Sequence, residues 1–151
     1  MTSDSGSDGA ARFNHQGHQG HQEHQEIGDD LDAIARTIVD AGLAVHKALG
    51  PGLLESAYEH CLAHELGGRG LALQRQVALP IAYRGTRLDA GYRLDILVAR
   101  SVIVEVKAVE ALTRLHEAQV LTYLRLSGCR IGLLMNFNVS LFKNGVKRLI
   151  L

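Results

Sequence analysis

The sequence predicts an α/β fold, in which helices pack on a single mixed β-sheet. Three observations predict it: two helical segments open the folded part, three β-rich segments follow, and a further helix precedes two more strands. A run of strands, then a helix, then a returning strand requires both antiparallel and parallel pairing, with helices covering the sheet. The expected order of elements is therefore ααβββαββ.

Residues 1–28 differ in composition from the rest of the chain. They are rich in Ser, Gly, Asp, His and Gln, and a His-Gln pair recurs every three residues from His15 onward. Because these residues include few apolar side chains, burial cannot offset the conformational entropy that the segment would lose on folding. We therefore expect a disordered low-complexity tail here. Its histidines could also bind a transition metal weakly, which is the lesser interpretation. Residues 29–151 are expected to form one domain.

Two helices are expected first in this domain. Apolar residues recur at helical spacing over residues 31–45, and Asp29 or Asp30 is a suitable N-cap. The Leu49-Gly50-Pro51-Gly52 stretch ends the helix, because glycine can adopt the left-handed conformation and proline cannot continue the hydrogen-bond ladder. The second helix is expected from Leu53 to Leu66, before two glycines.

Five strands and a third helix are expected in the remainder. Residues 74–83, 87–98, 101–109, 130–137 and 141–151 have strand composition, with turns at residues 84–86 and at Asn144-Gly145 and a bulge at Gly91. The run at 130–137 is mainly apolar, which is typical of a strand buried on both faces. The helix is expected over residues 113–127 and is closed by Gly128.

Composition excludes several classes of protein. No apolar run approaches the roughly 20 residues that span a bilayer, and the N-terminus lacks the apolar segment of a secretory signal. Cys61 and Cys129 are too few for a disulfide framework or a cysteine-rich cluster, so we expect reduced thiols in a cytoplasmic protein. Residues 31–151 hold fifteen basic and ten acidic residues, which suits a polyanionic partner but is also an ordinary surface.

The candidate chemistry lies on two neighbouring predicted strands. If residues 92–98 and 102–107 form a hairpin centred near Arg100, the numbers of facing residues add to 200, which places Asp95 opposite Glu105. Opposed side chains have Cβ atoms about 4.5–5.5 Å apart. Lys107 shares the face of Glu105, because side chains alternate along a strand. The register therefore predicts a patch of two carboxylates and one amine.

Two facing carboxylates repel each other, which would destabilise a purely structural sheet. A Mg²⁺ or Mn²⁺ ion between them would remove the conflict, since hard cations prefer oxygen ligands. Lys107 beside the metal would then orient or help deprotonate a water that attacks a phosphodiester. The alternative is a solvent-facing sheet edge with alternating charges, but the apolar flanks of Asp95 and Glu105 indicate burial.

Side chains on two helices could complete this site. His116, Gln119 and Tyr123 lie on one side of the third predicted helix, where they could hold a phosphate or support the metal ligands. Polar residues at a helix boundary are the competing explanation. On the second helix Glu55 shares a face with Tyr58. Glu55 could supply a further carboxylate or simply favour the helix N-terminus electrostatically, and Tyr58 could help to position substrate or ligands.

These residues resemble a known family. Gly52-Leu-Leu-Glu55-Ser-Ala-Tyr58 matches the pattern of the GxxExxY proteins, which are placed in the PD-(D/E)XK nuclease superfamily, and the likeness runs from about residue 34 to residue 151. The resemblance implies a restriction-endonuclease-like core with metal ligation by Asp95 and Glu105. It also implies the carbonyl of Val106 as a third ligand and Lys107 as the signature lysine.

The resemblance extends to the helices. Glu55 resembles the helix-borne glutamate of many superfamily members, and Gln119 with Tyr123 resembles the Gln-xxx-Tyr motif of RecB-type exonucleases. Leu94 departs from the pattern, because it stands where the signature has a proline. Members with an iron–sulfur cluster need four cysteines, which this chain does not have.

The sequence thus predicts a Mg²⁺- or Mn²⁺-dependent nuclease that acts on DNA in preference to RNA. The alternative is a catalytically silent module of the same fold that binds nucleic acid or a protein. A domain with few aromatic residues and modest basicity lacks an obvious recognition surface, so a protein partner or a homodimer is expected to supply one.

Overall fold

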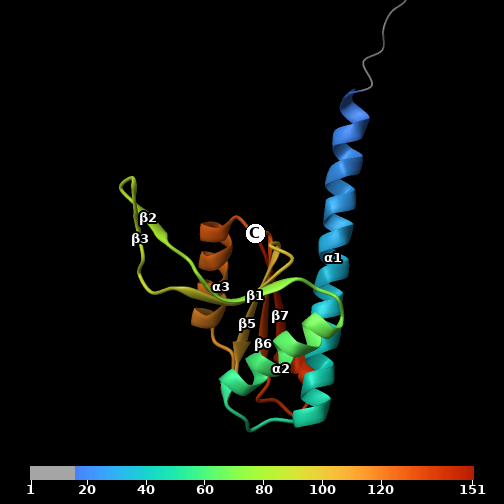
Figure 1. Ribbon diagram of the computed structural model, residues 1–151, viewed down its shortest axis with the longest axis vertical. Helices are drawn as coiled ribbons and strands as arrows, with labels where there is room; N and C mark the ends of the chain where they lie inside the picture. The colour runs from blue at the N-terminus through green and yellow to red at the C-terminus, as the bar shows by residue number, and fades with distance from the viewer. Residues whose placement is uncertain (1–15) are drawn as a thin grey trace, which may run out of the picture.

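The computed structural model describes the backbone of residues 16–151 and the side chains of residues 28–151. It has the mixed α/β architecture that the sequence predicts, with two helices before the first strand and one helix between β5 and β6 in chain order (Figure 1). The elements are α1 (Gln16–Leu49), α2 (Glu55–Gly68), β1 (Leu73–Ala78), β2 (Ile81–Tyr83), β3 (Thr86–Leu88), β4 (Arg93–Val98), β5 (Val102–Lys107), α3 (Arg114–Ser127), β6 (Ile131–Asn136), the 3-10 helix η1 (Phe142–Gly145) and β7 (Val146–Ile150).

One five-stranded sheet forms the centre, in the order β1-β4-β5-β6-β7. Every neighbouring pair is antiparallel except β5 and β6, which are parallel and are connected through α3. A parallel pair needs such a crossover, because its strands run in the same direction. As expected for a central strand, every residue of β6 is buried.

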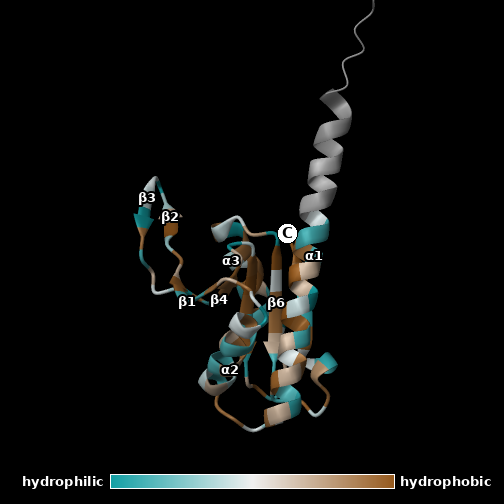
Figure 2. Ribbon diagram, turned by 45° about the vertical axis from the view of Figure 1, so that its right-hand side comes forward, coloured by the Kyte–Doolittle hydropathy of each residue, from teal (hydrophilic) through white to brown (hydrophobic). Residues whose placement is uncertain are grey.

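Helices cover both faces of this sheet. One hydrophobic cluster joins α1 and α2 to one face, and a second joins α3 to the other, so that apolar strands lie between apolar helix faces (Figure 2). Alternate residues of β5 belong to different clusters: Val104 packs under α1 and α2, whereas Ile103 packs under α3. Of the two strands that carry predicted site residues, β5 is therefore more deeply buried than β4.

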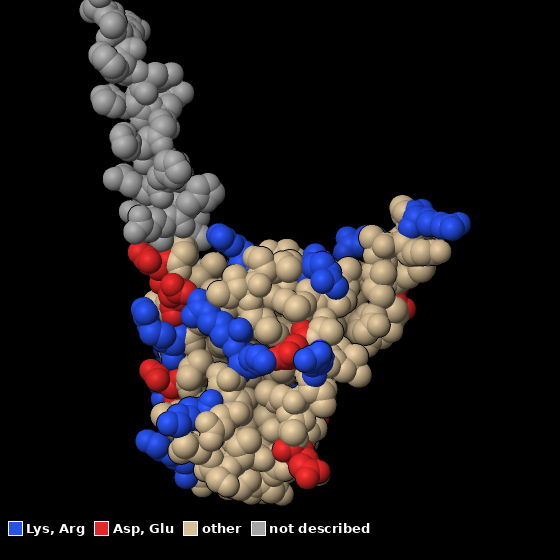
Figure 3. Space-filling model, turned by 180° about the vertical axis from the view of Figure 1, so that it is seen from behind, with Lys and Arg blue, Asp and Glu red and all other residues tan. Residues whose placement is uncertain are grey.

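The long hairpin predicted over residues 74–98 is interrupted. Its base is the β1–β4 pair of the main sheet, and its tip is a separate two-stranded arm, β2–β3, that projects from the body (Figures 1 and 3). Pro80 has no N–H to donate between β1 and β2, and Gly91 adopts a φ of 80° before β4. A single bond from Leu79 N–H to the Tyr92 carbonyl, at 2.9 Å, links the two sides there.

Helix α1 begins earlier than expected, at Gln16 rather than near Asp29 or Asp30. The prediction of a disordered tail over residues 1–28 falls on residues 1–15, which lie outside the described residues, and on residues 16–27, for which only the backbone is described. It therefore stays a prediction. Among the residues that the structure describes, no helix combines the length and the apolar character that crossing a bilayer requires.

Candidate metal centre

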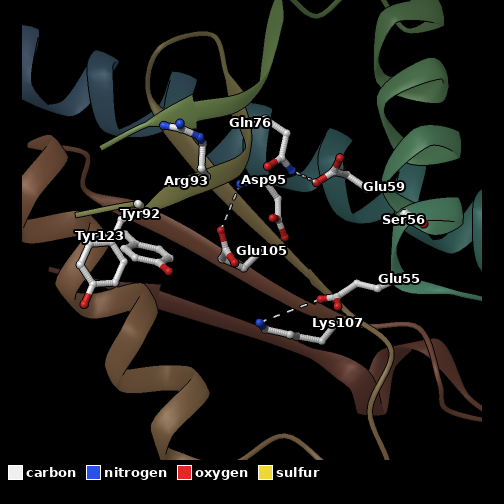
Figure 4. A pocket seen from close by; sticks show the side chains of 11 residues that line it. Glu55, Ser56, Glu59, Gln76, Tyr92, Arg93, Asp95, Glu105, Lys107 and Tyr123 are labelled. Atoms are coloured by element: carbon white, nitrogen blue, oxygen red, sulfur yellow. Dashed lines mark hydrogen bonds and ion pairs between the residues drawn. The ribbon is translucent and has the colours of Figure 1, made fainter. Parts of the chain in front are cut away.

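A pocket of about 440 Å³ opens beside β4 and β5, between α2 and α3 (Figure 4). Its walls come from both helices, from β1 and from the chain that leads into β4. Its lining is mostly polar and charged: Glu55, Ser56, Glu59, Gln76, Gly91, Tyr92, Arg93, Asp95, Glu105, Lys107 and Tyr123.

Strands β4 and β5 pair in the predicted register, which confirms the hairpin inferred from the sequence. The paired residues end at Ile96 and Val104, and beyond them carboxylate oxygens replace backbone partners. The Val106 amide donates to Asp95 Oδ2 at 2.9 Å, and the Asp95 amide donates to Glu105 Oε1 at 3.2 Å. The two acids therefore adjoin where the backbone pairing of β4 and β5 ends.

Strand β1 is distorted beside this pair. Gln76 has a φ of 51°, and the strand register pairs Arg75 with Ile96 and Val77 with Leu94 but leaves Gln76 and Asp95 without a bridge. A residue in the left-handed region breaks the ladder locally, as a bulge does. The Asp95 amide, which an undistorted β1 would engage, is thus available to Glu105.

Burial governs the electrostatics of the two acids. It raises the pKa of Glu105 to about 8, with a further increase from the neighbouring charge of Asp95. Burial also raises the pKa of Asp95 to about 6, although the hydrogen bond from the Val106 amide opposes the increase. Without a cation, the pair therefore holds a proton near neutral pH, and a bound cation would displace it.

Lys107 and Glu55 form an ion pair in the wall of the pocket. Lys107 Nζ lies 4.0 Å from Glu55 Oε1, and Figure 4 shows both side chains directed toward the space beside the two strand acids. Glu55 is the first residue of α2, so its carboxylate also favours the helix N-terminus. Both of the roles considered for Glu55 thus remain compatible with its position, and its nearest cation is Lys107.

The donors at the strand acids suit a hard divalent cation. Within one strand residue the amide and the carbonyl point to the same side, so the Val106 carbonyl faces β4 beyond the last backbone pair. Together with Asp95 and Glu105 it would make an all-oxygen set, which is the preference of Mg²⁺ and Mn²⁺, although Val106 is not itself among the residues that line the pocket. The described residues contain no cluster of three or more His, Cys, Asp or Glu side chains that could hold an ion. Backbone oxygen and water would complete the set.

Of the residues predicted on α3, only Tyr123 reaches the pocket. Tyr92 packs against it edge to face, with ring centroids 6.0 Å apart, and burial raises the pKa of Tyr123. Gln119 is not among the lining residues. His116 sits in the capping box of α3: its Nδ1 accepts from the Thr113 amide at 3.0 Å, and its own amide donates to the Thr113 hydroxyl at 3.3 Å. The structure thus gives His116 a capping contact outside the pocket.

Tyr58 likewise lies in the core and not in the pocket. Its ring is fully buried and stacks on Phe137 with centroids 4.7 Å apart. Its hydroxyl donates to the Gly50 carbonyl at 2.5 Å and accepts from the Leu53 amide at 3.1 Å. Tyr58 therefore holds the loop before α2, and through it the start of the helix that carries Glu55.

Sequence reasoning missed the buried carboxylate of Glu59 in the pocket wall. Arg75 donates to its Oε2 at 2.5 Å and Gln76 to its Oε1 at 2.7 Å. The available signal was its spacing, because residues four apart share a helix face and Glu55 is four residues earlier. Its partners on β1 depend on how α2 packs against the sheet, which no local pattern reveals.

Comparison with protein families identifies the fold. No curated protein and no solved structure matches the chain. The family model described as the PD-(D/E)XK nuclease superfamily matches residues 32–149, a range that contains strands β1 to β6, most of β7 and every lining residue of the pocket. The acid pair on adjoining strands, with a lysine two residues after the second acid, stands inside that match. The chain belongs to the PD-(D/E)XK nuclease superfamily.

Proposed function

We propose that this protein is a Mg²⁺- or Mn²⁺-dependent nuclease that hydrolyses phosphodiester bonds, with DNA as the preferred substrate. One observation supports it above the others: the carboxyl groups of Asp95 and Glu105 adjoin in a pocket that Lys107 also lines. Within the superfamily, the pattern at residues 52–58 favours membership of the GxxExxY group.

Asp95, Glu105 and the Val106 carbonyl would hold the metal, and Glu55, which lines the same pocket, would add a further carboxylate. When bound, the metal supplies a Lewis acid that neutralises charge on the phosphate and lowers the pKa of water. Lys107 Nζ would orient the attacking water and stabilise the negative charge that develops on the phosphate oxygens. Glu55, 4.0 Å away, balances the charge of that amine.

Tyr123 is the residue of α3 best placed to position substrate. Its ring lies against Tyr92 at the pocket wall, whereas Gln119 does not line the pocket. Replacing Tyr123 with Phe is therefore expected to weaken cleavage more than Gln119→Ala does. This comparison separates a substrate contact from a residue that only matches a motif.

Cleavage of single- and double-stranded DNA with Mg²⁺ or Mn²⁺, by the wild type and the Lys107→Ala variant, tests the proposal. We expect metal-dependent cleavage that falls about 10²–10⁴-fold in the variant, the usual contribution of a group that assists proton transfer. Lys143→Ala is the matched control, since Lys143 is exposed on η1, outside the pocket. Equal cleavage by wild type and Lys107→Ala would refute the role of the lysine.

The second candidate is a silent module that binds nucleic acid without cutting it. It is favoured by the absence, among the described residues, of a third side chain that joins the acid pair in a ready-made cluster. Salt-dependent DNA binding with no cleavage in either metal would select this alternative.

A further inference from the structure

The β2–β3 arm contributes little to the folded core. Residues 82–88 are all exposed, and none of residues 81–88 belongs to either hydrophobic cluster. Its two strands pair only with each other, and such an isolated hairpin is marginally stable in water. In Figures 1 and 2 the arm stands away from the sheet and the helices. The arm therefore has no evident role in stabilising the domain, and this indicates that it serves as a surface for a partner.

The arm carries arginine and no acid over residues 81–88. Arg84 lies at its turn, with its guanidinium 5.5 Å from the centroid of the Tyr83 ring, and Arg87 lies on β3. Among the described residues neither arginine forms an ion pair. The basic side chains at the tip are visible in Figure 3. A guanidinium that stacks on an aromatic ring keeps its edge for bidentate binding of a phosphate.

The chain of the arm continues directly into the pocket wall. Beyond β3, the Asp89 carboxylate accepts a hydrogen bond from the Gly91 amide at 3.0 Å, which shapes the return. Tyr92 and Arg93 follow, and both line the pocket. A polymer with one phosphate at the strand acids can therefore extend along this wall toward the arm.

We propose that the β2–β3 arm binds the phosphate backbone of nucleic acid next to the pocket, through Arg84 and Arg87. This rests on the proposed function, because it assigns the substrate contact of the same site. The arm supplies the recognition surface that overall composition did not reveal. It acts on affinity for the polymer, whereas hydrolysis at the acids depends on the residues of the pocket.

Two substitutions test the arm without disturbing its turn. Arg84 and Gly85 have φ values of 49° and 78°, so the two-residue turn is of the type for which Asn-Gly is the preferred pair. Arg84→Asn therefore removes the charge while favouring the turn, and Arg87→Thr removes the other charge with a strand-forming residue. Arg100→Asn is the matched control, because Arg100 is also exposed, with a φ of 53°, in the turn at the other end of β4.

Binding of a fluorescent DNA duplex and of its single strand is measured with EDTA present, over a range of salt concentrations. We expect the double variant Arg84→Asn/Arg87→Thr to bind about tenfold more weakly at low salt. The slope of the logarithm of its affinity against the logarithm of the salt concentration should fall by the amount that corresponds to about two phosphate contacts. Arg100→Asn should bind as the wild type does. Cleavage of a p-nitrophenyl ester of thymidine monophosphate, too small to reach the arm, should be equal in all three proteins.

The outcomes separate the arm from the nuclease proposal. Wild-type affinity in the double variant, or an equal loss in Arg100→Asn, would overturn the role of the arm while leaving Lys107-dependent cleavage intact. Arm-dependent binding without any metal-dependent cleavage would support the arm and overturn the nuclease. A wild type that binds no DNA would overturn the arm proposal.

Discussion

The backbone amide of Asp95 donates a hydrogen bond to Glu105 Oε1 at 3.2 Å, so the strand that carries one acid holds the side chain of the other. Because the donor is part of the main chain, replacing Glu105 by Gln keeps an oxygen for it to bind. The same holds for the Val106 amide and the side chain of Asp95, at 2.9 Å. Amide substitutions at these positions therefore test charge with little change of shape.

The stability of the metal-free protein is expected to fall as pH rises. Folding raises the pKa of Glu105 from 4.5 to about 8, so the folded state binds this proton more tightly than the unfolded state does. The resulting stabilisation is complete below the unfolded pKa and is lost as pH rises through about 8. The Glu105→Gln side chain stays neutral at every pH. The free energy of unfolding of this variant, relative to that of the wild type, should therefore rise by about 2 kcal/mol or more between pH 5 and pH 9.

Chemical denaturation at several pH values, with EDTA present, measures this difference. Glu110→Gln is the control, because Glu110 is exposed and its substitution should leave the pH profile as it is in the wild type. A Glu105→Gln profile parallel to that of the wild type would show that burial does not perturb this acid.

Metal binding at pH 7 should release about one proton. The pKa of Glu105, about 8, keeps that carboxyl protonated there, while Asp95, with a pKa of about 6, is mostly ionised. A cation needs both carboxylates deprotonated, so binding must displace the remaining proton. Calorimetric titration with Mn²⁺ in two buffers of different ionisation enthalpy gives the proton count. A heat of binding that is independent of the buffer would contradict the prediction.

Glu55 and Asp95 should differ in their effect on metal affinity. Asp95 adjoins Glu105, whereas the nearest cation to Glu55 is Lys107, and its side chain is 49% exposed. We expect Asp95→Asn to weaken Mn²⁺ binding by about 100-fold or more and Glu55→Gln by less than about tenfold. Titration of both variants measures this. Equal losses would make Glu55 a direct ligand instead.

Tyr58→Phe should destabilise the protein without changing metal affinity. The hydroxyl bridges the Gly50 carbonyl and the Leu53 amide, and the phenylalanine ring would still stack on Phe137. Losing these two bonds is expected to cost about 1–3 kcal/mol. Thermal unfolding checks the stability, and Mn²⁺ titration checks the site. A variant as stable as the wild type, but with weakened metal binding, would place Tyr58 in the site and not beneath it.

Local patterns predicted the parts of this protein that depend on neighbours in the chain. The β4–β5 register followed from a short turn between two β-branched segments, and it brings Asp95 and Glu105 beside each other where the backbone pairing ends. Gly128 likewise caps α3 as predicted, whereas Thr113, which was expected to be the first residue of the helix, is its N-cap. The division of the long hairpin was missed although Pro80 signalled it, because alternating apolar residues continue on both sides of the proline.

Features that depend on packing between distant elements were not predicted. The spacing of Glu55, Tyr58 and Leu62 places them on one helix face, but it does not show that Tyr58 and Leu62 enter the core while Glu55 remains half exposed. The distortion of β1 at Gln76 likewise has no signal in the sequence, since glutamine has no preference for a positive φ. Both depend on where α2 meets the sheet.

The central position of β5 has a consequence for how the molecule fluctuates. Amide hydrogens in a strand paired on both sides exchange with solvent only in rare, large openings, whereas those of an isolated hairpin exchange through frequent local fraying. Glu105 and Lys107 stand where β5 still pairs with β6 but no longer with β4, and their backbone is expected to exchange more slowly than that of the β2–β3 arm. In the proposed nuclease the arm would therefore adjust to irregular polymer shapes while the metal ligands hold their spacing.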